Sequence, residues 1–309
     1  MSDSRILVTG GAGFIGSHLV DALLARGHAV RVLDNLSSGK RANLPTDDPR
    51  LDLQVGDVAD PEAVRAAMAG CTAVAHLAAV ASVQASVEDP VATHRSNFLG
   101  TLNVCEAMRE QGIRRVLFAS SAAVYGQNGE SEAIDEDTPK APLTPYAVDK
   151  LASEYYLDFY RRQHGLEPAI FRFFNVFGPR QDPSSPYSGV ISIFTERARA
   201  GLPITLFGDG EQTRDFIYVA DLAALLVQAL ERPQVEAGAV NVGLGRATSL
   251  NQLLATIGEL LGGLPPVAHA PVRAGDIRHS LADNRRLLAR FGLPQPTPIR
   301  TGLERLLAG

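Results

Sequence analysis

Near its start the chain reads Arg5-Ile6-Leu7-Val8-Thr9-Gly10-Gly11-Ala12-Gly13-Phe14-Ile15-Gly16. The apolar run at 6–8 predicts a buried strand, and residues 14–26 after the glycines have the pattern of a helix. Glycines between a strand and a helix let the backbone approach a pyrophosphate at the helix N-terminus. This stretch therefore predicts a dinucleotide-binding strand–turn–helix unit.

Short apolar runs recur along the chain and alternate with longer amphipathic segments. We expect strands at 30–33, 51–55, 73–77, 116–119 and 169–173, and crossover helices at 61–69, 90–111 and 146–164. Runs of this kind are typical of strands buried on both faces of a parallel sheet. The pattern predicts an α/β fold with a doubly wound parallel Rossmann sheet.

A stretch rich in Pro, Gly and Ser at 178–189 interrupts this alternation and predicts a domain boundary. Shorter elements follow it, with helices expected at 191–200, 219–231, 250–261 and 301–307 and a strand at 204–207. We expect a dinucleotide-binding domain at 1–177, to which 216–242 returns. A smaller C-terminal α/β substrate domain is expected at 178–215 and 243–309.

Composition and charge argue against several classes of protein. The 309-residue chain has a net charge of −5, whereas a nucleic-acid partner usually requires a basic face. Cys71 and Cys105 make neither a disulfide framework nor a metal-type spacing, and the seven histidines form no metal-binding pattern. The apolar stretches are shorter than a membrane span. We expect a cytoplasmic protein with no metal, no nucleic-acid partner and no membrane contact.

One carboxylate is placed to select the dinucleotide. Asp34 lies 18 residues beyond Gly16, at the end of the expected second strand. There it would accept hydrogen bonds from the adenine ribose hydroxyls and repel a 2′-phosphate, which favours NAD over NADP. Asp57 follows the expected third strand, where contact with the adenine amine and a solvated loop position are both open.

A second motif supplies an acid–base pair. Tyr146 and Lys150 are four residues apart, so a helix would place both side chains on one face. A phenol with a usual pKa of about 10 is a poor base at neutral pH, but a neighbouring cation favours the phenolate. Ser121 precedes Tyr146 by 25 residues. A proton acceptor beside a dinucleotide site predicts hydride-transfer chemistry.

These motifs together resemble the extended short-chain dehydrogenase/reductase family over nearly the whole chain. Within that family the chain is similar to UDP-sugar 4-epimerases. The similarity is carried by Ser120-Ser121-Ala122-Ala123-Val124-Tyr125-Gly126, Tyr146-Ala147-Val148-Asp149-Lys150, Arg172-Phe173-Phe174-Asn175-Val176-Phe177-Gly178 and Thr213-Arg214-Asp215-Phe216-Ile217-Tyr218-Val219-Ala220-Asp221. It implies that Tyr146 is the catalytic base, that Ser121 hydrogen-bonds the sugar O4, and that Lys150 holds the nicotinamide ribose and lowers the tyrosine pKa. Oxidation and re-reduction at C4 would then regenerate the NAD.

The same resemblance implies two sets of binding residues. The cofactor is expected to contact Gly10, Gly13, Phe14, Ile15, Gly16, Asp34, Asn35, Ser38, Gly39, Asp57, Val58, Leu77, Ala78, Ala79, Asn97, Tyr146 and Lys150. The UDP-sugar is expected to contact Ser82, Ser121, Asn175, Val190, Leu206, Phe207, Arg214, Arg273, Asp276 and Ser280. The two arginines would grip the diphosphate, because a planar guanidinium can meet phosphate oxygens bidentately. For Ser82 an ordinary loop role is equally open.

Two positions narrow the reaction and the sugar. Relatives that eliminate water or decarboxylate a uronic acid carry acidic residues where this chain has Ala122-Ala123, so the resemblance implies epimerisation. Relatives restricted to glucose and galactose tend to have a bulky tyrosine where Ser280 stands, and a serine leaves room for an acetamido group. We expect UDP-GlcNAc/UDP-GalNAc as substrates, with UDP-Glc/UDP-Gal also admitted. Two alternatives stay open: a UDP-glucuronate 4-epimerase that uses Arg180 near C6, and a non-catalytic sensor of NAD or a nucleotide sugar.

The expected helices at 90–111 and 146–164 carry apolar residues at helical spacing, among them Leu102 and Phe159. Burial against the chain's own sheet explains one such face per helix, and a subunit interface explains it equally well. In the resembled family these helices pair with those of a second copy in a four-helix bundle. The resemblance therefore implies a homodimer.

Overall fold

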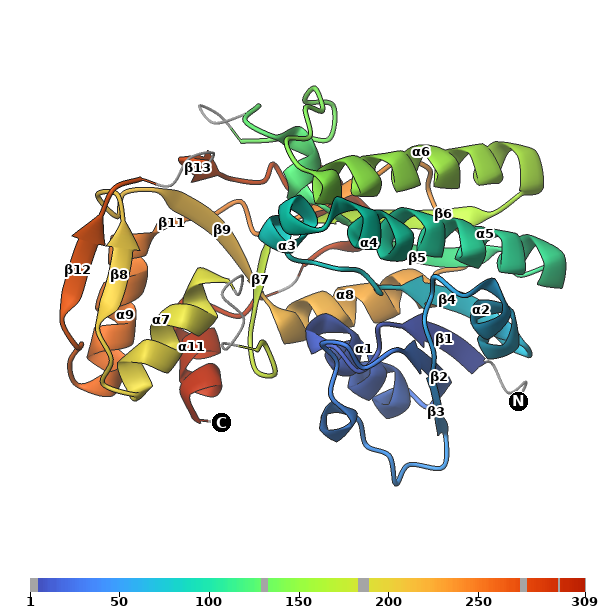
Figure 1. Ribbon diagram of the computed structural model, residues 1–309, viewed down its shortest axis with the longest axis horizontal. Coiled ribbons are helices and arrows are strands. Elements are labelled where there is room, and N and C mark those ends of the chain that lie inside the picture. Colours follow the sequence, from blue (N-terminus) through green and yellow to red (C-terminus); the bar gives the residue numbers. More distant parts are fainter. Residues whose placement is uncertain (1–4, 129–132, 183–188, 273–276, 294, 309) are drawn as a thin grey trace. The chain divides into compact units, whose positions relative to one another are not determined.

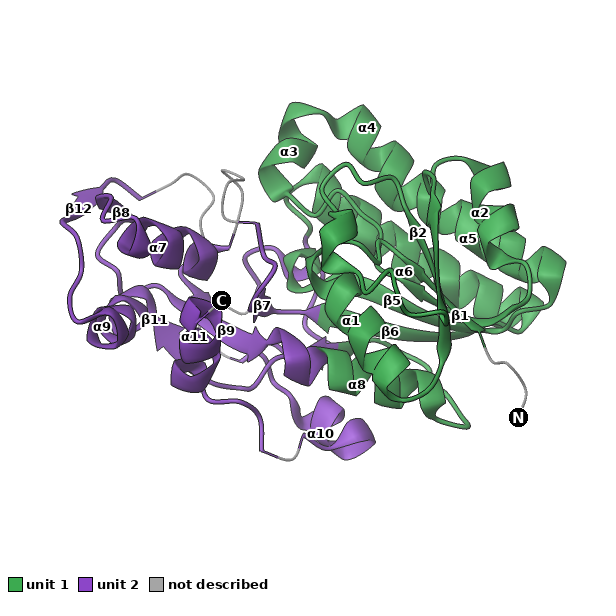
Figure 2. Cartoon of the chain, turned by 90° about the horizontal axis from the view of Figure 1, so that it is seen from below, with its two compact units in different colours: residues 1–124, 142–172, 223–240 green, residues 125–141, 173–222, 241–309 purple. Residues whose placement is uncertain are grey.

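The chain forms two compact units in the computed structural model, which describes residues 5–128, 133–182, 189–272, 277–293 and 295–308 (Figures 1 and 2). Unit 1 holds residues 1–124, 142–172 and 223–240, and unit 2 holds residues 125–141, 173–222 and 241–309. The sequence predicts changes of domain after residues 177, 215 and 242, and the units change after 172, 222 and 240. Segment 125–141 lies with unit 2 although it precedes the predicted boundary.

The largest sheet, most of whose residues belong to unit 1, has the strand order β10-β6-β5-β4-β1-β2-β3. The strands are β1 (Arg5–Thr9), β2 (Ala29–Asp34), β3 (Leu51–Val55), β4 (Cys71–His76), β5 (Arg115–Ser121), β6 (Glu167–Phe173) and β10 (Val240–Val242). The first five pair in parallel. The order reverses between β1 and β4, and open α/β sheets bind ligands at the carboxyl ends of the strands at such a point. The predicted doubly wound sheet is confirmed.

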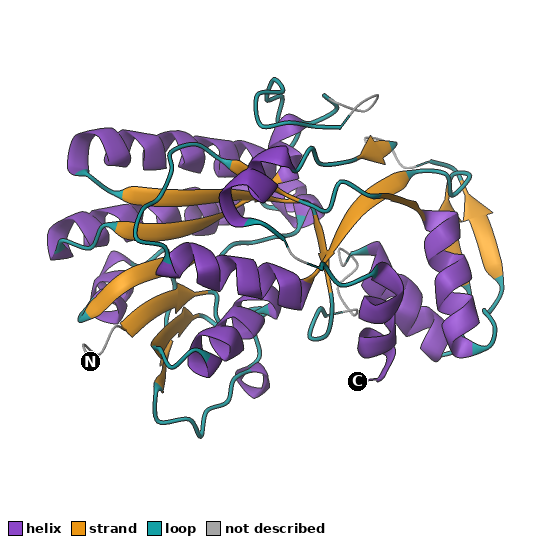
Figure 3. Ribbon diagram, turned by 180° about the vertical axis from the view of Figure 1, so that it is seen from behind, coloured by secondary structure: helices purple, strands orange, loops and turns teal. Residues whose placement is uncertain are grey.

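Helices cover both faces of this sheet (Figures 1 and 3). They are α1 (Phe14–Ala25), α2 (Pro61–Met68), α3 (Val83–Glu88), α4 (Pro90–His94), α5 (Gly100–Gln111), α6 (Pro145–His164) and α8 (Val219–Glu231), with short 3-10 turns η1 (Arg41–Asn43) and η3 (Ala122–Tyr125). The helix predicted at 90–111 is interrupted by one π-helical turn, η2 (Arg95–Leu99). Such turns break the α-helical register and recur at functional sites.

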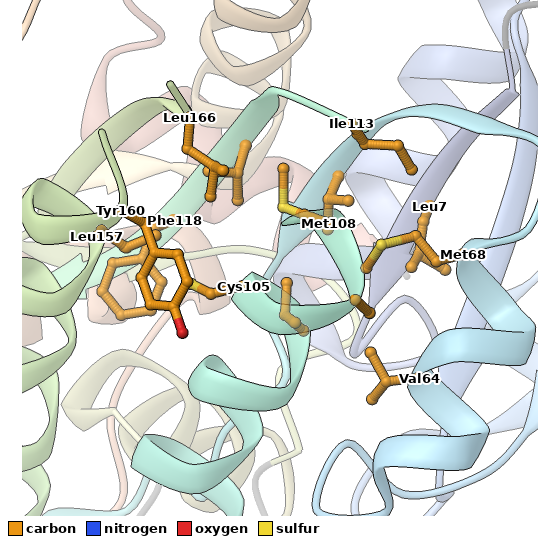
Figure 4. Packing of buried hydrophobic residues seen from close by; sticks show 14 of the residues in the cluster. Leu7, Val64, Met68, Cys105, Met108, Ile113, Phe118, Leu157, Tyr160 and Leu166 are labelled. Atoms are coloured by element: carbon orange, nitrogen blue, oxygen red, sulfur yellow. The ribbon is translucent and has the colours of Figure 1, made fainter. Parts of the chain in front are cut away.

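A layer of apolar side chains holds α2, α5 and α6 on the sheet (Figure 4). Phe118 comes from β5, Met108 from α5 and Leu157 from α6, and each is at most 1% exposed. Burial of one such side chain contributes roughly 1.5–3 kcal/mol. The layer therefore fixes α6 firmly on β5, which determines where the side chains of α6 lie.

Unit 2 has two small sheets. β8 (Ile204–Phe207) pairs in parallel with β12 (Val267–Ala270), and β9 (Thr213–Tyr218) pairs with β7 (Asn175–Phe177), β11 (Ala247–Ser249) and β13 (His279–Ser280). Its helices are α7 (Val190–Arg199), α9 (Leu250–Leu261), α10 (Arg285–Phe291) and α11 (Ile299–Ala308). The sequence predicts the longer helices and β8. Most of the missed strands have two to four residues, too few to show a period.

The turn after β1 is packed too tightly for side chains. Gly10 has φ 70°, and a Cβ there would lie 2.7 Å from the backbone nitrogen of Ala78. A Cβ on Gly16 would lie 2.1 Å from the carbonyl oxygen of Gly10. Three backbone segments therefore meet at this turn because glycine occupies these positions. Within the described ranges, no helix is long and apolar enough to cross a lipid bilayer.

Candidate active site

The glycine turn and the start of α1 form a cradle for an anionic group. Gly13 is the residue before α1, so the unpaired N–H groups of the first helical turn point out at the glycine-rich loop. The helix dipole adds a partial positive charge there. A side chain at Gly16 would clash with the backbone of this turn, and one at Gly10 with the backbone of Ala78. The residues present therefore fit a dinucleotide pyrophosphate.

Asp34 is tied to this turn by two backbone hydrogen bonds. The N–H of Ala12 donates to its Oδ2 at 2.9 Å, and the N–H of Leu36 donates to its Oδ1 at 2.8 Å. A Cβ on Gly39 would press on Oδ1 at 2.9 Å, so the neighbouring loop also leaves room for the carboxylate. A carboxylate has about four acceptor positions, which leaves capacity for a ribose hydroxyl.

Asp57 links the ends of two strands. Its Oδ2 accepts from Nδ2 of Asn35 at 3.0 Å, and its Oδ1 accepts from the N–H of Ala59 at 2.8 Å. These contacts are compatible with both roles left open for Asp57, a contact with the adenine amine and a loop position. Val58 is buried and packs against Gly100, so its side chain belongs to the core.

The loop after β4 is held by Asn97 in the π-helical turn. The side-chain oxygen of Asn97 accepts from the N–H of Val80 at 2.7 Å, and its amide nitrogen donates to the Val80 carbonyl at 3.1 Å. Leu77 and Ala78 bond to the backbone and hydroxyl oxygens of Thr9 at 3.1 and 3.3 Å. Asn97 therefore fixes the conformation of the loop that is predicted to bind the cofactor, by hydrogen bonding to the backbone of that loop.

The structure brings Ser121, Tyr146 and Lys150 together inside unit 1. Thr144 caps α6 and Pro145 is its first residue, so Tyr146 lies in the first turn of the helix. Tyr146 hydrogen-bonds the side chain of Ser121, which is the last residue of β5. The Lys150 ammonium nitrogen lies 5.8 Å from the centroid of the Tyr146 ring.

Burial dominates the charge state of this cluster. It raises the pKa of the Tyr146 phenol, and the hydrogen bond with Ser121 offsets only part of the rise. Burial also lowers the pKa of Lys150 to about 8, against the opposing charges of Asp149 and Glu154. In the chain alone the net shift of the Tyr146 pKa is upward, and the lowering by Lys150 that the family resemblance implies stays a prediction.

A buried, neutral histidine of β4 lies near Lys150. His76 is 1% exposed, with Nδ1 2.7 Å from the Thr9 hydroxyl and Nε2 3.1 Å from the Thr101 hydroxyl. Burial, followed by the charge of Lys150, lowers the pKa of His76 to about 3. The imidazole stays uncharged and links β1, β4 and α5. In the described part of the chain, no three His, Cys, Asp or Glu side chains form a group able to hold a metal.

Three predicted substrate residues share the β7–β9–β13 sheet of unit 2. Ser280 of β13 is paired with Arg214 of β9, and Asn175 of β7 is paired with Phe216 of β9. The Arg214 guanidinium donates to the Thr213 carbonyl at 2.9 Å, and the Asn175 amide donates to the Asp215 carbonyl at 3.3 Å. The structure thus places Arg214 and Ser280 side by side.

The other predicted substrate residues are less uniform. Leu206 is buried in the core of unit 2, so its side chain does not match a ligand contact. The Phe207 carbonyl accepts a hydrogen bond from Nε2 of Gln212 at 2.6 Å. Val190 begins α7 and packs against the same core. Ser82 caps α3 by accepting from the N–H of Ala85 at 3.0 Å, as in the loop role left open for it. Arg273 and Asp276 lie outside the described residues.

Sequence reasoning assigns no role to the buried carboxylates Asp215 and Glu154. Asp215 is fully buried and accepts from the N–H groups of Leu244, Gly245 and Ala282. Burial raises its pKa, and these backbone donors oppose the rise. Glu154 accepts from Arg172 and Ser120 inside unit 1. Its spacing of four residues from Lys150 is a signal that could have identified it.

We predict that Lys150→Met stabilises the NAD-free protein at pH 7. The lysine pKa falls from about 10.4 in the unfolded chain to about 8 in the folded one. At pH values between these two pKa values the unfolded state binds more protons than the folded state, so the contribution of Lys150 to the free energy of unfolding rises with pH. Below pH 8 the destabilisation by the buried ammonium is fully present. The variant should gain about 1–3 kcal/mol at pH 7 and lose that gain by pH 10.5.

Urea unfolding of wild type and variant at pH 7, 9 and 10.5 measures this difference. Lys40→Met, at an exposed lysine, is the matched control and should show no gain at any pH. A gain for Lys150→Met that does not change with pH would contradict a buried ammonium.

Comparison with known proteins agrees with this geometry. Residues 6–243 match the NAD dependent epimerase/dehydratase family. A UDP-glucose 4-epimerase of Mycolicibacterium smegmatis is 38% identical over 310 residues, which cover 97% of this chain and 96% of that protein. The structure of Thermus thermophilus UDP-glucose 4-epimerase in complex with NAD has a TM-score of 0.90 and 42% identity over 98% of each chain.

A further similar structure is a UDP-N-acetylglucosamine 4-epimerase from Methanobrevibacter ruminantium M1 in complex with UDP-N-acetylmuramic acid. It has a TM-score of 0.93 and 37% identity, and covers 100% of this chain and 98% of that one. The family resemblance of the motifs is confirmed. The chain belongs to the NAD-dependent epimerase/dehydratase family, and it is an epimerase that uses NAD.

Proposed function

We propose that this protein interconverts UDP-hexoses by inverting C4, with UDP-GlcNAc and UDP-GalNAc as the main pair and UDP-Glc and UDP-Gal as further substrates. The observation that carries the proposal is the buried cluster in which Ser121 hydrogen-bonds Tyr146 one helical turn from Lys150. It lies in the unit that contains the glycine cradle. The proposal also draws on the 4-epimerases among the similar proteins.

Each side chain of the cluster has a separate task. NAD, when bound, supplies a hydride acceptor and donor for C4. Tyr146 Oη accepts the proton of the sugar O4 hydroxyl as C4 is oxidised to a ketone, and gives it back when C4 is reduced on its other face. Ser121 orients the same oxygen by a hydrogen bond. Lys150 stabilises the phenolate that accepts the proton, since the group is too buried for water to do so.

The residues after β5 favour epimerisation over elimination or decarboxylation. Ala122 and Ala123 form the start of the short turn η3 directly after Ser121. Neither side chain can carry a proton, whereas loss of water or carbon dioxide from the sugar calls for a second acid or base near C5 or C6. A reversible oxidation at C4 needs only the proton carrier already described.

The size of Ser280 supports an acetamido sugar. It is paired with Arg214, our candidate for gripping the diphosphate, and its side chain is only partly buried. A serine leaves space that a larger residue would fill. The similar protein from Methanobrevibacter ruminantium M1 is a UDP-N-acetylglucosamine 4-epimerase, which points in the same direction.

We also propose a homodimer formed by α4, η2, α5 and α6. Large apolar side chains are exposed along α4, η2 and α6, including Val91 at 71%, Tyr155 at 65% and Phe159 at 44%. Pro90, Leu99, Leu143 and Val148 line an apolar groove on the same surface. Contiguous apolar surface of this kind marks an interaction site more often than it marks a free face.

Tyr146→Phe should reduce kcat for UDP-GlcNAc about 100-fold or more, because the proton acceptor is removed. The matched control is Tyr155→Phe on the same helix, which removes an exposed hydroxyl and should keep wild-type turnover. Purified enzyme is incubated with UDP-GlcNAc, and the products are separated by chromatography. Undiminished conversion by Tyr146→Phe would refute this assignment, and no conversion by wild type would favour a non-catalytic sensor.

Ser280→Tyr should suppress conversion of UDP-GlcNAc while sparing UDP-Glc, because the ring would fill the space for the acetamido group. We expect a change of at least tenfold in the ratio of the two kcat/KM values, about 1.4 kcal/mol. Ser280→Ala keeps the space and should leave the ratio unchanged. UDP-glucuronate forms a third arm of the assay, and preferential turnover of it would replace the proposed substrate by a uronic acid.

Tyr155→Glu should convert the dimer to a monomer, because a charge at the centre of an apolar interface is costly to bury. Light scattering after size exclusion should give about twice 32.9 kDa for wild type and 32.9 kDa for the variant. Leu202→Glu places the same charge at an exposed leucine of unit 2 and should leave the mass unchanged. A monomeric wild type would rule out this dimer.

A further inference from the structure

A buried carboxylate lies on the same helix as the acid–base cluster. Glu154 accepts from the Arg172 guanidinium through both oxygens, at 2.9 Å to Oε1 and 2.6 Å to Oε2. The side chains of Glu154 and Arg172 are only 7% and 6% exposed. The hydroxyl of Ser120 also donates to Oε1 at 2.5 Å. A buried ion pair is weak evidence for stability, because its desolvation cost can exceed its attraction.

Glu154 continues the face that carries the cluster. Tyr146, Lys150 and Glu154 are spaced by four residues on α6, so they lie on successive turns of one face. Each turn makes a contact with β5: Tyr146 with Ser121, Lys150 with the Phe118 ring at 4.9 Å, and Glu154 with Ser120. Since Ser120 directly precedes Ser121, the Glu154 contact fixes the end of the strand that presents Ser121 to Tyr146.

We propose that Glu154 is a positioning residue for the reaction, which holds the Ser121 end of β5 against the face of α6 that carries Tyr146 and Lys150. The proposal rests on the proposed epimerase function, because it concerns proton transfer at Tyr146. Arg172 of β6 and Ser120 of β5 set the orientation of the carboxylate by occupying both of its oxygens. Glu154 acts through these strands and through its charge, without touching the substrate.

The charge of Glu154 supports the protonated form of Lys150. Two carboxylates, those of Asp149 and then Glu154, oppose the burial that lowers the lysine pKa to about 8. Asp149 is paired with the half-exposed His94, whose Nδ1 lies 2.8 Å from Oδ1. His76, on the β4 side, stays neutral. Because Glu154 is buried, solvent screens its field only weakly, and its charge acts on the lysine pKa although Arg172 neutralises part of it. Removal of the Glu154 charge should therefore lower the lysine pKa further.

Two variants test the positioning role through kinetics. Ser120→Ala removes one hydroxyl and leaves the ion pair intact, and Glu154→Gln with Arg172→Gln removes both charges without leaving an unpaired one. Both should lower kcat for UDP-GlcNAc about tenfold with KM within about twofold of wild type, because misplaced groups affect the chemical step. In the double variant the alkaline limb of the kcat profile should also move to lower pH.

Asp52→Asn is the matched control, since it breaks the Arg31–Asp52 ion pair of β2 and β3 in the same sheet. It should leave kcat and its pH profile unchanged, although it weakens the fold. Wild-type kcat and pH profile in Ser120→Ala and in the double variant would overturn the proposal. If the double variant does not fold, Ser120→Ala decides the outcome through kcat and KM.

A stability cycle on the NAD-free protein gives a readout that needs no turnover. The gain from Lys150→Met at pH 7 should be larger in the double variant than in wild type, because the ammonium has lost one supporting carboxylate. Equal gains in the two backgrounds would show that Glu154 and Lys150 are not coupled and would overturn the charge argument. If wild type converts no UDP-sugar, the proposed function fails, and this cycle still decides the coupling.

Discussion

A positive charge buried away from water is the constraint on which the arrangement of unit 1 depends. The Lys150 ammonium lies near the faces of the Phe118 and Tyr146 rings, in a position where burial lowers its pKa to about 8. Such a charge is kept only where nearby carboxylates support it. Glu154 and Asp149 supply that support, and each needs a partner of its own. The buried Lys150 cation thus accounts for a network of buried polar groups that reaches into β5 and β6.

The cofactor side of unit 1 obeys a different constraint, the close approach of backbone segments. The turn after β1 and the loop after β4 come within contact at Gly10 and Ala78, at the point where the strand order reverses. A side chain at Gly10 would push these two segments apart and close the anion-binding cradle at the start of α1. The π-helical turn serves the same end, because it lets the Asn97 amide hold both backbone groups of Val80.

The sequence predicts what local patterns encode and misses what depends on distant partners. The glycine turn, the long helices and the Tyr146–Lys150 pair are visible because their spacing reflects strand and helix periods. Nothing in the sequence indicates that Glu154 meets Arg172, 18 residues away, and Ser120, 34 residues away. The family resemblance implies a cofactor contact for Asn97, whereas in the structure its side chain hydrogen-bonds the backbone of Val80. The short strands of unit 2 arise from tertiary pairing, which no residue period reveals.

Burial acts on the two members of the acid–base pair in opposite directions, and this bears on reversibility. It raises the pKa of Tyr146 and lowers that of Lys150, so it opposes a charged phenolate–ammonium pair and favours the neutral forms. In so dry a site, any charge that appears or disappears nearby alters the proton affinity of Tyr146 far more than it would at the surface. The proton transfer at Tyr146 and the hydride transfer at C4 are then coupled, because each changes the charge that the other experiences. A tyrosine of this kind can take up and return the same proton within one cycle, as inversion at C4 requires.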